Sequence, residues 1–139
     1  MEKAKSYRDL EVWVRSKELA VEIYKMTSFL PIEERFSLSD QLRRAAISIP
    51  SNIAEGQQRY GVKEFIRFIS ISRGSTAELI TQLEIVAELY PELNSSVVTL
   101  LQEYNKLGKR LYNLLTYLKS KLRLHVKSFM KDNKEFFGS

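Results

Sequence analysis

The chain has 139 residues, of which 44% are hydrophobic and 28% charged, values that fit one domain with a hydrophobic core. It contains no Cys and a single His, which excludes disulfide scaffolds, thiolate metal sites, cysteine catalysis and His-rich metal sites. No apolar run approaches the ~18 residues of a membrane-spanning helix, and the N-terminal residues are polar, so we expect a cytoplasmic protein.

The net charge of +5 is concentrated in the last third of the chain. Residues 94–139 contain nine basic and three acidic residues, whereas residues 1–93 contain 13 basic and 14 acidic residues. Such an asymmetry indicates a polyanionic partner. A solubilising helix face is the alternative, since this net charge is ordinary for a small soluble domain.

The first predicted helix covers residues 7–29, where apolar residues recur at spacings of three and four. Ser6 and Asp9 have the spacing of a capping box, which satisfies the free N–H groups at a helix start. Pro31 is expected to end this helix, because proline restricts the residue before it and has no N–H to continue the helix.

The second predicted helix begins near Ser37, which forms another capping-box pattern with Asp40. Gly56 is a plausible C-terminal cap, so we expect the helix to end near it. Pro50 lies inside the pattern, and its missing N–H group predicts a kink at this position.

The third predicted helix covers residues 62–90 and ends before Pro91, which makes it over ~40 Å long. Two of its faces are apolar, and a helix of this kind buries more than one surface. We therefore infer an interface between subunits, with a helix at the centre of the bundle as the alternative. The second apolar face consists of Phe68, Ile71, Ile85 and Leu89.

The fourth predicted helix opens at Asn94 or Ser95 and carries leucines in a heptad-like pattern up to Leu122. Gly108 interrupts this pattern and would permit a close helix approach. Beyond Leu122 we expect the helix to fray. The chain is therefore predicted to be all-α: an N-terminal tail (1–6), an up-and-down four-helix bundle (7–122) with its second helix kinked at Pro50, and a basic C-terminal tail (123–139).

Two polar stripes lie beside the apolar faces of the second and third helices. If they meet, Arg44 would pair with Glu78 or Glu55, and Asn52 would bond to Ser75 or Gln82. Partly buried pairs of this type fix helix register or subunit geometry, so we interpret both stripes as structural or interfacial. Their residues are Arg44, Ser48, Asn52 and Glu55 on the second helix and Ser75, Glu78 and Gln82 on the third.

Catalytic patterns are absent from the sequence. No Glu-x-x-His pair of a di-metal bundle exists, because Leu122 precedes the single His125 by three residues. Neither Ser48 nor Ser75 has a histidine at a helical spacing that would let it act as the general base for a serine nucleophile. The sequence also contains no glycine-rich phosphate-binding loop. We expect no enzyme activity, no cofactor and no metal; a ligand or metal site at Glu55 and Glu78 is a weaker hypothesis.

The basic residues of the fourth helix and tail form a candidate nucleic-acid stripe, interleaved with Tyr112 and Tyr117. Lysine and arginine neutralise phosphates, and aromatic rings stack on unpaired bases. No helix-turn-helix or zinc-finger pattern indicates sequence-specific reading, and a membrane surface is disfavoured because the leucines are needed in the core. The candidate residues are Lys106, Lys109, Arg110, Lys119, Lys121, Arg123 and Lys127.

The stretch FSLSDQLRRAAISIPSNIAEG at residues 36–56 closely resembles the signature of the bacterial 23S rRNA-intervening sequence proteins. Residues 9–13 resemble the start of the first helix of that family, and residues 65–68, 73–79 and 82–83 resemble its third helix. The resemblance implies a small bundle that assembles into a ring, typically a homopentamer, without catalytic activity. A related branch, the accessory variability determinants of diversity-generating retroelements, binds a reverse transcriptase and nucleic acid.

Charge and resemblance together favour a homo-oligomeric bundle that associates with RNA or a ribonucleoprotein. The alternative is an interaction module, such as an accessory subunit of a reverse transcriptase in a retroelement.

Overall fold

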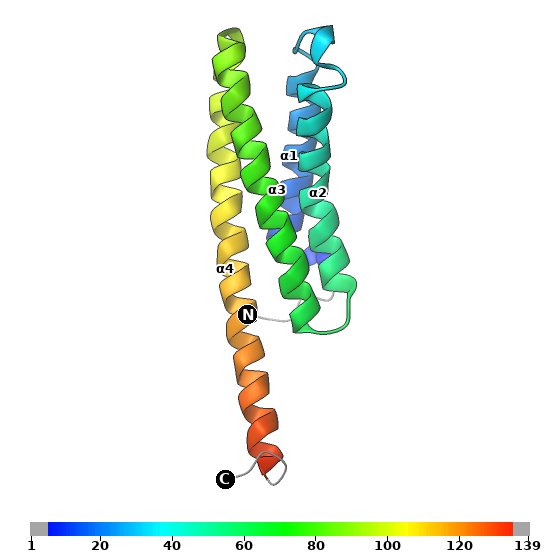
Figure 1. Ribbon diagram of the computed structural model, residues 1–139, viewed down its shortest axis with the longest axis vertical. Coiled ribbons are helices and arrows are strands. Elements are labelled where there is room, and N and C mark those ends of the chain that lie inside the picture. Colours follow the sequence, from blue (N-terminus) through cyan, green and yellow to red (C-terminus); the bar gives the residue numbers. More distant parts are fainter. Residues whose placement is uncertain (1–5, 135–139) are drawn as a thin grey trace.

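A computed structural model describes residues 6–134 of the protein; residues 1–5 and 135–139, the outer parts of the two predicted tails, lie outside the described residues. Four helices make up the fold: α1 (Glu11–Thr27), α2 (Leu38–Gln58), α3 (Val62–Leu89) and α4 (Asn94–Asp132). They run up and down side by side (Figure 1), and the described part of the chain contains no strand. The predicted all-α four-helix bundle is confirmed.

The core is a continuous layer of aliphatic side chains contributed by all four helices. Each helix supplies them at the predicted spacing of three and four, so one face of every helix is removed from water. Tyr104 of α4 is the largest fully buried side chain. Its hydroxyl has no hydrogen-bond partner among the described residues, and burial raises its pKa well above the usual tyrosine range.

Both predicted capping boxes are wrong in detail. The Ser6 side chain accepts a hydrogen bond from the Arg8 backbone N–H (3.2 Å) and caps a short 3-10 turn (Tyr7–Asp9), after which α1 begins at Glu11. The Ser37 hydroxyl instead donates to a carboxylate oxygen of Glu34 (2.8 Å), so it caps no helix. In both cases the serine side chain hydrogen-bonds within a turn that precedes the helix, and not to the first turn of α1 or α2.

Gly56 does not end α2, which continues to Gln58. The glycine is buried in the α2–α3 contact, where a β-carbon would lie 2.6 Å from Cβ of Phe68 and 3.1 Å from Cδ1 of Phe65. Its role is therefore close helix approach. Gly108, expected to serve that purpose, lies in a looser contact, because a β-carbon there would meet Thr76 Cγ2 at an ordinary 3.8 Å.

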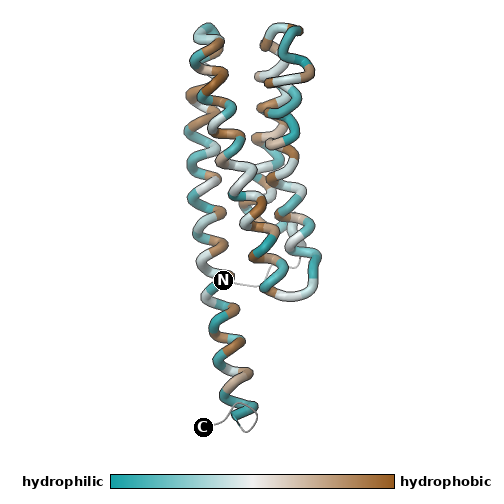
Figure 2. The backbone as a smooth tube through the Cα atoms, in the orientation of Figure 1, coloured by the Kyte–Doolittle hydropathy of each residue, from teal (hydrophilic) through white to brown (hydrophobic). Residues whose placement is uncertain are grey.

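The fourth helix is longer than the sequence pattern predicts. It runs to Asp132, although Leu118 is its last buried residue. Residues 119–132, the α4 extension, project beyond the ends of the other three helices (Figure 1). Hydrophilic and hydrophobic residues alternate around the extension (Figure 2), so its helical pattern persists after the core has ended. Within the described residues, no helix is long and apolar enough to span a membrane.

Candidate nucleic-acid interface

The two predicted polar stripes meet within a single subunit. The hydroxyl oxygens of Ser48 on α2 and Ser75 on α3 lie 2.8 Å apart. Asn52 donates to both the backbone carbonyl (2.8 Å) and the hydroxyl (3.0 Å) of Ser48, one turn earlier on its own helix. The stripes thus form a short hydrogen-bonded chain across the α2–α3 contact.

The charged residues of the two stripes form ion pairs or hydrogen bonds with residues of their own helices. Arg44 donates to Asp40 (2.9 Å) and Glu55 accepts from Arg59 (2.7 Å), so the predicted pairing of Arg44 with Glu78 or Glu55 is not formed. The Gln82 amide donates to Glu78 (3.3 Å). Asn52 hydrogen-bonds to neither of its predicted partners, Ser75 and Gln82, because its amide donates to Ser48.

A further polar contact beside Pro50 was not predicted. The buried hydroxyl of Ser72 on α3 donates to the backbone carbonyl of Ile49 on α2 (2.9 Å). Pro50 is itself buried inside α2 and lacks the N–H that would bond to the Ala46 carbonyl. The contact from Ser72 therefore anchors α3 next to the one place in α2 where the backbone ladder is interrupted.

The second apolar face of α3 is mostly open to solvent in the single chain. Phe68 is buried beside Gly56, but Ile71, Ile85 and Leu89 are 40%, 43% and 59% exposed. The bundle does not cover this face, which excludes the alternative in which α3 lies at the bundle centre with both faces filled.

The predicted basic stripe divides into two sides of α4. On the side facing α1, Arg110 pairs with Glu11 (2.8 Å) and Lys106 approaches Glu103 (3.5 Å). Lys121 follows Arg110 by about three helical turns and lies on the same side. The α1-facing cations at Lys106 and Arg110 are thus already neutralised by carboxylates.

Glu103 holds a second cation on this side. Its carboxylate accepts from the Arg15 guanidinium of α1 (2.9 Å), and this hydrogen bond lowers the pKa of Glu103 below its usual range. Arg15 also lies 3.6 Å from Glu18 of its own helix. The three cations of this network therefore face three carboxylates, and the α1–α4 contact carries little net positive charge.

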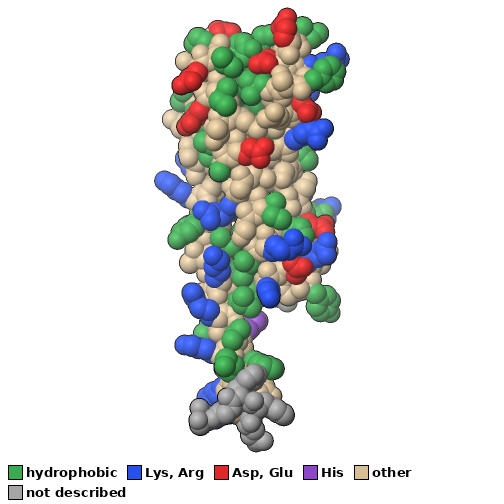
Figure 3. All heavy atoms as spheres, viewed as in Figure 1, with side chains coloured by type: hydrophobic (Ala, Val, Ile, Leu, Met, Phe, Trp, Pro, Cys, Tyr) green, Lys and Arg blue, Asp and Glu red, His purple; other side chains and the backbone are tan. Residues whose placement is uncertain are grey.

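The α3-facing side of α4 is different. Lys109 lines the same groove as Arg73 of α3. Lys119, Arg123 and Lys127 follow Lys109 at spacings that keep them on that side of the extension. None of these five forms an ion pair with a described residue. Figure 3 shows cationic side chains following α4 down onto its extension, while acidic side chains gather at the opposite end of the bundle. We call Arg73, Lys109, Lys119, Arg123 and Lys127 the basic face.

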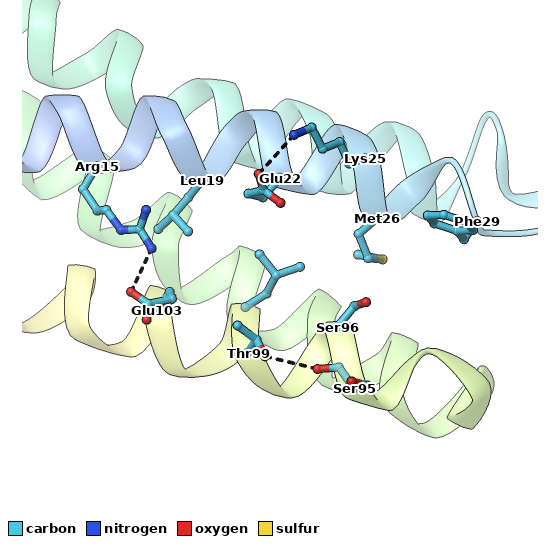
Figure 4. Close-up of a pocket in the computed structure, with 11 residues that line it drawn as sticks. Arg15, Leu19, Glu22, Lys25, Met26, Phe29, Ser95, Ser96, Thr99 and Glu103 are labelled. Atoms are coloured by element: carbon cyan, nitrogen blue, oxygen red, sulfur yellow. Dashed lines mark hydrogen bonds and ion pairs between the residues drawn. The ribbon is translucent and has the colours of Figure 1, made fainter.

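Two grooves run beside α4. The α1–α4 groove (Figure 4), of about 590 Å³, is lined by the paired groups Arg15 and Glu103, by Glu22, which pairs with Lys25 (3.4 Å), and by hydroxyl groups such as that of Thr99. The α3–α4 groove, of about 520 Å³, is lined by two cations and no carboxylate. Only the second groove therefore belongs to the basic face.

Arg73 is the functional candidate that the sequence analysis missed. Its guanidinium lies over the ring of Tyr112 on α4, 5.1 Å from the ring centre. In the sequence Arg73 stands in a segment with a net negative charge, and nothing local connects it with α4. Only the antiparallel packing of α3 on α4 places it next to Lys109.

The described residues contain no group of three or more His, Asp or Glu side chains arranged to hold a metal ion. Glu55 and Glu78, the residues of the weaker ligand hypothesis, are occupied by Arg59 and Gln82 respectively. His125 is exposed on the α4 extension.

Comparison with known proteins agrees with this architecture. No curated protein matches the chain. A crystal structure of a protein of unknown function from the S23 ribosomal protein family of Bacteroides thetaiotaomicron superimposes with a TM-score of 0.67 at 24% identity, over 75% of this chain and 97% of that chain, and supports the fold. A family model described as 23S rRNA-intervening sequence protein matches residues 8–113, most of the bundle. The chain thus belongs to the 23S rRNA-intervening sequence protein family.

Proposed function

We propose that the protein is a non-enzymatic homo-oligomer that associates with RNA through its basic face. The observation that carries the proposal is the basic face itself, four cations on the α3-facing side of α4 together with Arg73 of α3, none of them in an ion pair with a described residue. Unpaired lysine and arginine side chains bind phosphates and release the counterions condensed on the nucleic acid. The family description, which refers to 23S rRNA, favours RNA as the polyanion.

The exposed apolar face of α3 supports assembly with further copies of the same chain. Ile71, Ile85 and Leu89 are apolar side chains in contact with water, and burying them is favourable. The surfaces of α2 and α3 carry both signs of charge, as the exposed ion pairs Arg44–Asp40, Arg59–Glu55 and Arg67–Glu64 show. A face of mixed charge can meet another copy of itself without net repulsion.

Assembly would also strengthen RNA binding. Each additional subunit repeats the basic face, and a long RNA that contacts one subunit meets the next at a high effective concentration. The candidate nucleophiles give no support to catalysis, because Ser48 and Ser75 hydrogen-bond to each other and His125 lies on the α4 extension.

The proposal is tested by fluorescence anisotropy with labelled single-stranded RNA at several salt concentrations. We expect the affinity of the wild type to fall as salt rises. The triple variant Lys119→Gln, Arg123→Gln, Lys127→Gln should bind more weakly with a shallower salt dependence, by about 0.7 in logarithmic slope for each phosphate that it no longer neutralises. The matched control removes Lys106 and Arg110, whose charges are already paired. An affinity that is independent of salt, or equal in the triple variant and the wild type, would contradict the proposal.

A further inference from the structure

The α3–α4 groove has the features of a site for a single nucleotide. Its volume of about 520 Å³ lies within the ~300–1,000 Å³ usual for small-molecule sites. Gly108 and Ala77 are the smallest residues that line it, and the space that larger side chains would fill at these two positions is part of the groove. A β-carbon on Gly108 would find room (3.8 Å to Thr76), so close packing of the helices does not require this glycine.

The groove combines the two kinds of contact that a nucleotide needs. Arg73 and Lys109 supply positive charge for a phosphate, and no carboxylate lines the groove to oppose it. Tyr112, 54% exposed, supplies an aromatic surface, and the planar Arg73 guanidinium, whose central carbon lies 5.1 Å from the ring centre, adds a second flat group. Nucleobases stack on both tyrosine rings and arginine guanidinium planes.

A hydrogen-bonding group completes the site. The side-chain amide of Asn105 donates to the Leu101 carbonyl (2.8 Å), which fixes the amide while its oxygen stays available as an acceptor. A carbonyl oxygen at this position can accept from a base amino group or from a ribose 2′-hydroxyl.

The α1–α4 groove provides an internal comparison. It is of similar size but is lined by Glu22 and Glu103, whose negative charges repel a phosphate, and its cations are paired. Size alone therefore does not distinguish the two grooves, whereas charge and the exposed tyrosine do.

We infer that the α3–α4 groove binds one unpaired nucleotide of a single-stranded RNA, with the base stacked on the Tyr112–Arg73 pair and the phosphate near Lys109. The inference rests on the proposed RNA association and narrows its substrate class to single strands. In a duplex the bases are stacked inside the helix and cannot reach the ring.

The test compares two RNA probes of equal length: a single strand carrying one 2-aminopurine, and the corresponding duplex. We expect Tyr112→Leu to weaken binding of the single strand about tenfold, to abolish the quenching of 2-aminopurine, and to leave duplex binding unchanged. Tyr117→Leu is the matched control, because Tyr117 is an exposed tyrosine of α4 (38%) that does not line the groove. Circular dichroism verifies that both variants keep their helices.

A second variant, Ala77→Leu, fills the groove without removing a charge or an aromatic ring, and it should reduce single-strand binding in the same way. If Tyr112→Leu, Tyr117→Leu and the wild type bind the single strand equally well, the inference is overturned. The proposed function still stands in that case, provided that single-strand binding by the wild type weakens as salt rises and is weaker in the variant that lacks Lys119, Arg123 and Lys127. A wild type that binds neither probe at low salt overturns both.

Discussion

Ser48 of α2 and Ser75 of α3 are joined by a hydrogen bond of 2.8 Å between their hydroxyl oxygens. Asn52 adds two bonds to Ser48 on its own helix. A partly buried polar pair of this kind loses its bond if one helix slides along the other by a turn. The pair therefore fixes the register of α2 against α3, the helix that carries the exposed apolar face.

Replacing either serine with alanine should lower the free energy of unfolding by about 1 kcal/mol, the usual net value of one hydrogen bond. The double variant should cost less than the sum of the single variants, because both remove the same bond. Urea denaturation of the four proteins measures this coupling. Strict additivity would show that the two hydroxyls contribute separately.

Gly56→Ala should destabilise the protein by about 1–3 kcal/mol, since the new methyl group would overlap Cβ of Phe68 at 2.6 Å and the two helices must move apart. Gly108→Ala is the control in α4. It meets no close contact and should stabilise the protein by about 0.5–1 kcal/mol through helix propensity. Thermal and urea unfolding measure both. Equal effects of the two substitutions would show that close approach at Gly56 is unimportant.

Two tyrosines should respond in opposite ways to removal of the hydroxyl. The buried Tyr104 hydroxyl has no partner among the described residues, so Tyr104→Phe should raise the free energy of unfolding by about 1 kcal/mol. The Tyr90 hydroxyl donates to Glu34 (2.9 Å), and Tyr90→Phe should lower it by about the same amount. Urea denaturation checks both; a loss of stability in Tyr104→Phe would mean that its hydroxyl is satisfied.

Helix boundaries follow from the sequence where a residue forbids continuation. Pro91 and Gly61, whose φ of 91° favours glycine, bracket α3, and the predicted range of 62–90 differs from the observed one by a single residue. The end of α4 was missed for a different reason. α4 continues to Asp132, whereas its last buried residue is Leu118. The prediction followed the spacing of core residues, and such a spacing cannot locate a helix end that lies beyond the core.

The site was less accessible to sequence reasoning than the fold. Arg44 was expected to reach across to another helix, but Asp40 lies one turn away on its own helix, within reach of the guanidinium, and pairs with it. The sequence analysis also counted Lys106 and Arg110 as free cations. Glu103 stands three residues before Lys106, a spacing that already allows an ion pair on one helix. The partner of Arg110, Glu11, lies on α1 and becomes apparent only in the structure. The Arg73–Tyr112 contact joins residues on different helices, so periodicity within one helix could not reveal it.

The Arg15–Glu103 ion pair predicts a specific pH dependence. The pKa of Glu103 is lowered in the folded protein, so its contribution to stability is present above the ordinary glutamate value of 4.5 and is lost as the pH falls through the lowered value. Glu103→Gln should therefore be less stable than the wild type at pH 7, and the difference should disappear in strong acid.

The measurement is urea denaturation of both proteins from pH 7 down to pH 3. Glu18→Gln is the control, because Glu18 lies farther from Arg15 (3.6 Å) on the exposed surface of α1; its effect should be smaller. A Glu103→Gln difference that stays constant across the whole pH range would contradict an ionised Glu103 as its source.

Both the assembly and the RNA association are tested by the absolute mass in solution, measured by light scattering with and without single-stranded RNA at low and high salt. We expect a mass that is a multiple of the 16.2 kDa chain, that increases with RNA at low salt and that returns to the protein value at high salt. Ile85→Lys on the exposed face of α3 should reduce the multiple. A mass of one chain that does not change with RNA would contradict both the assembly and the RNA association.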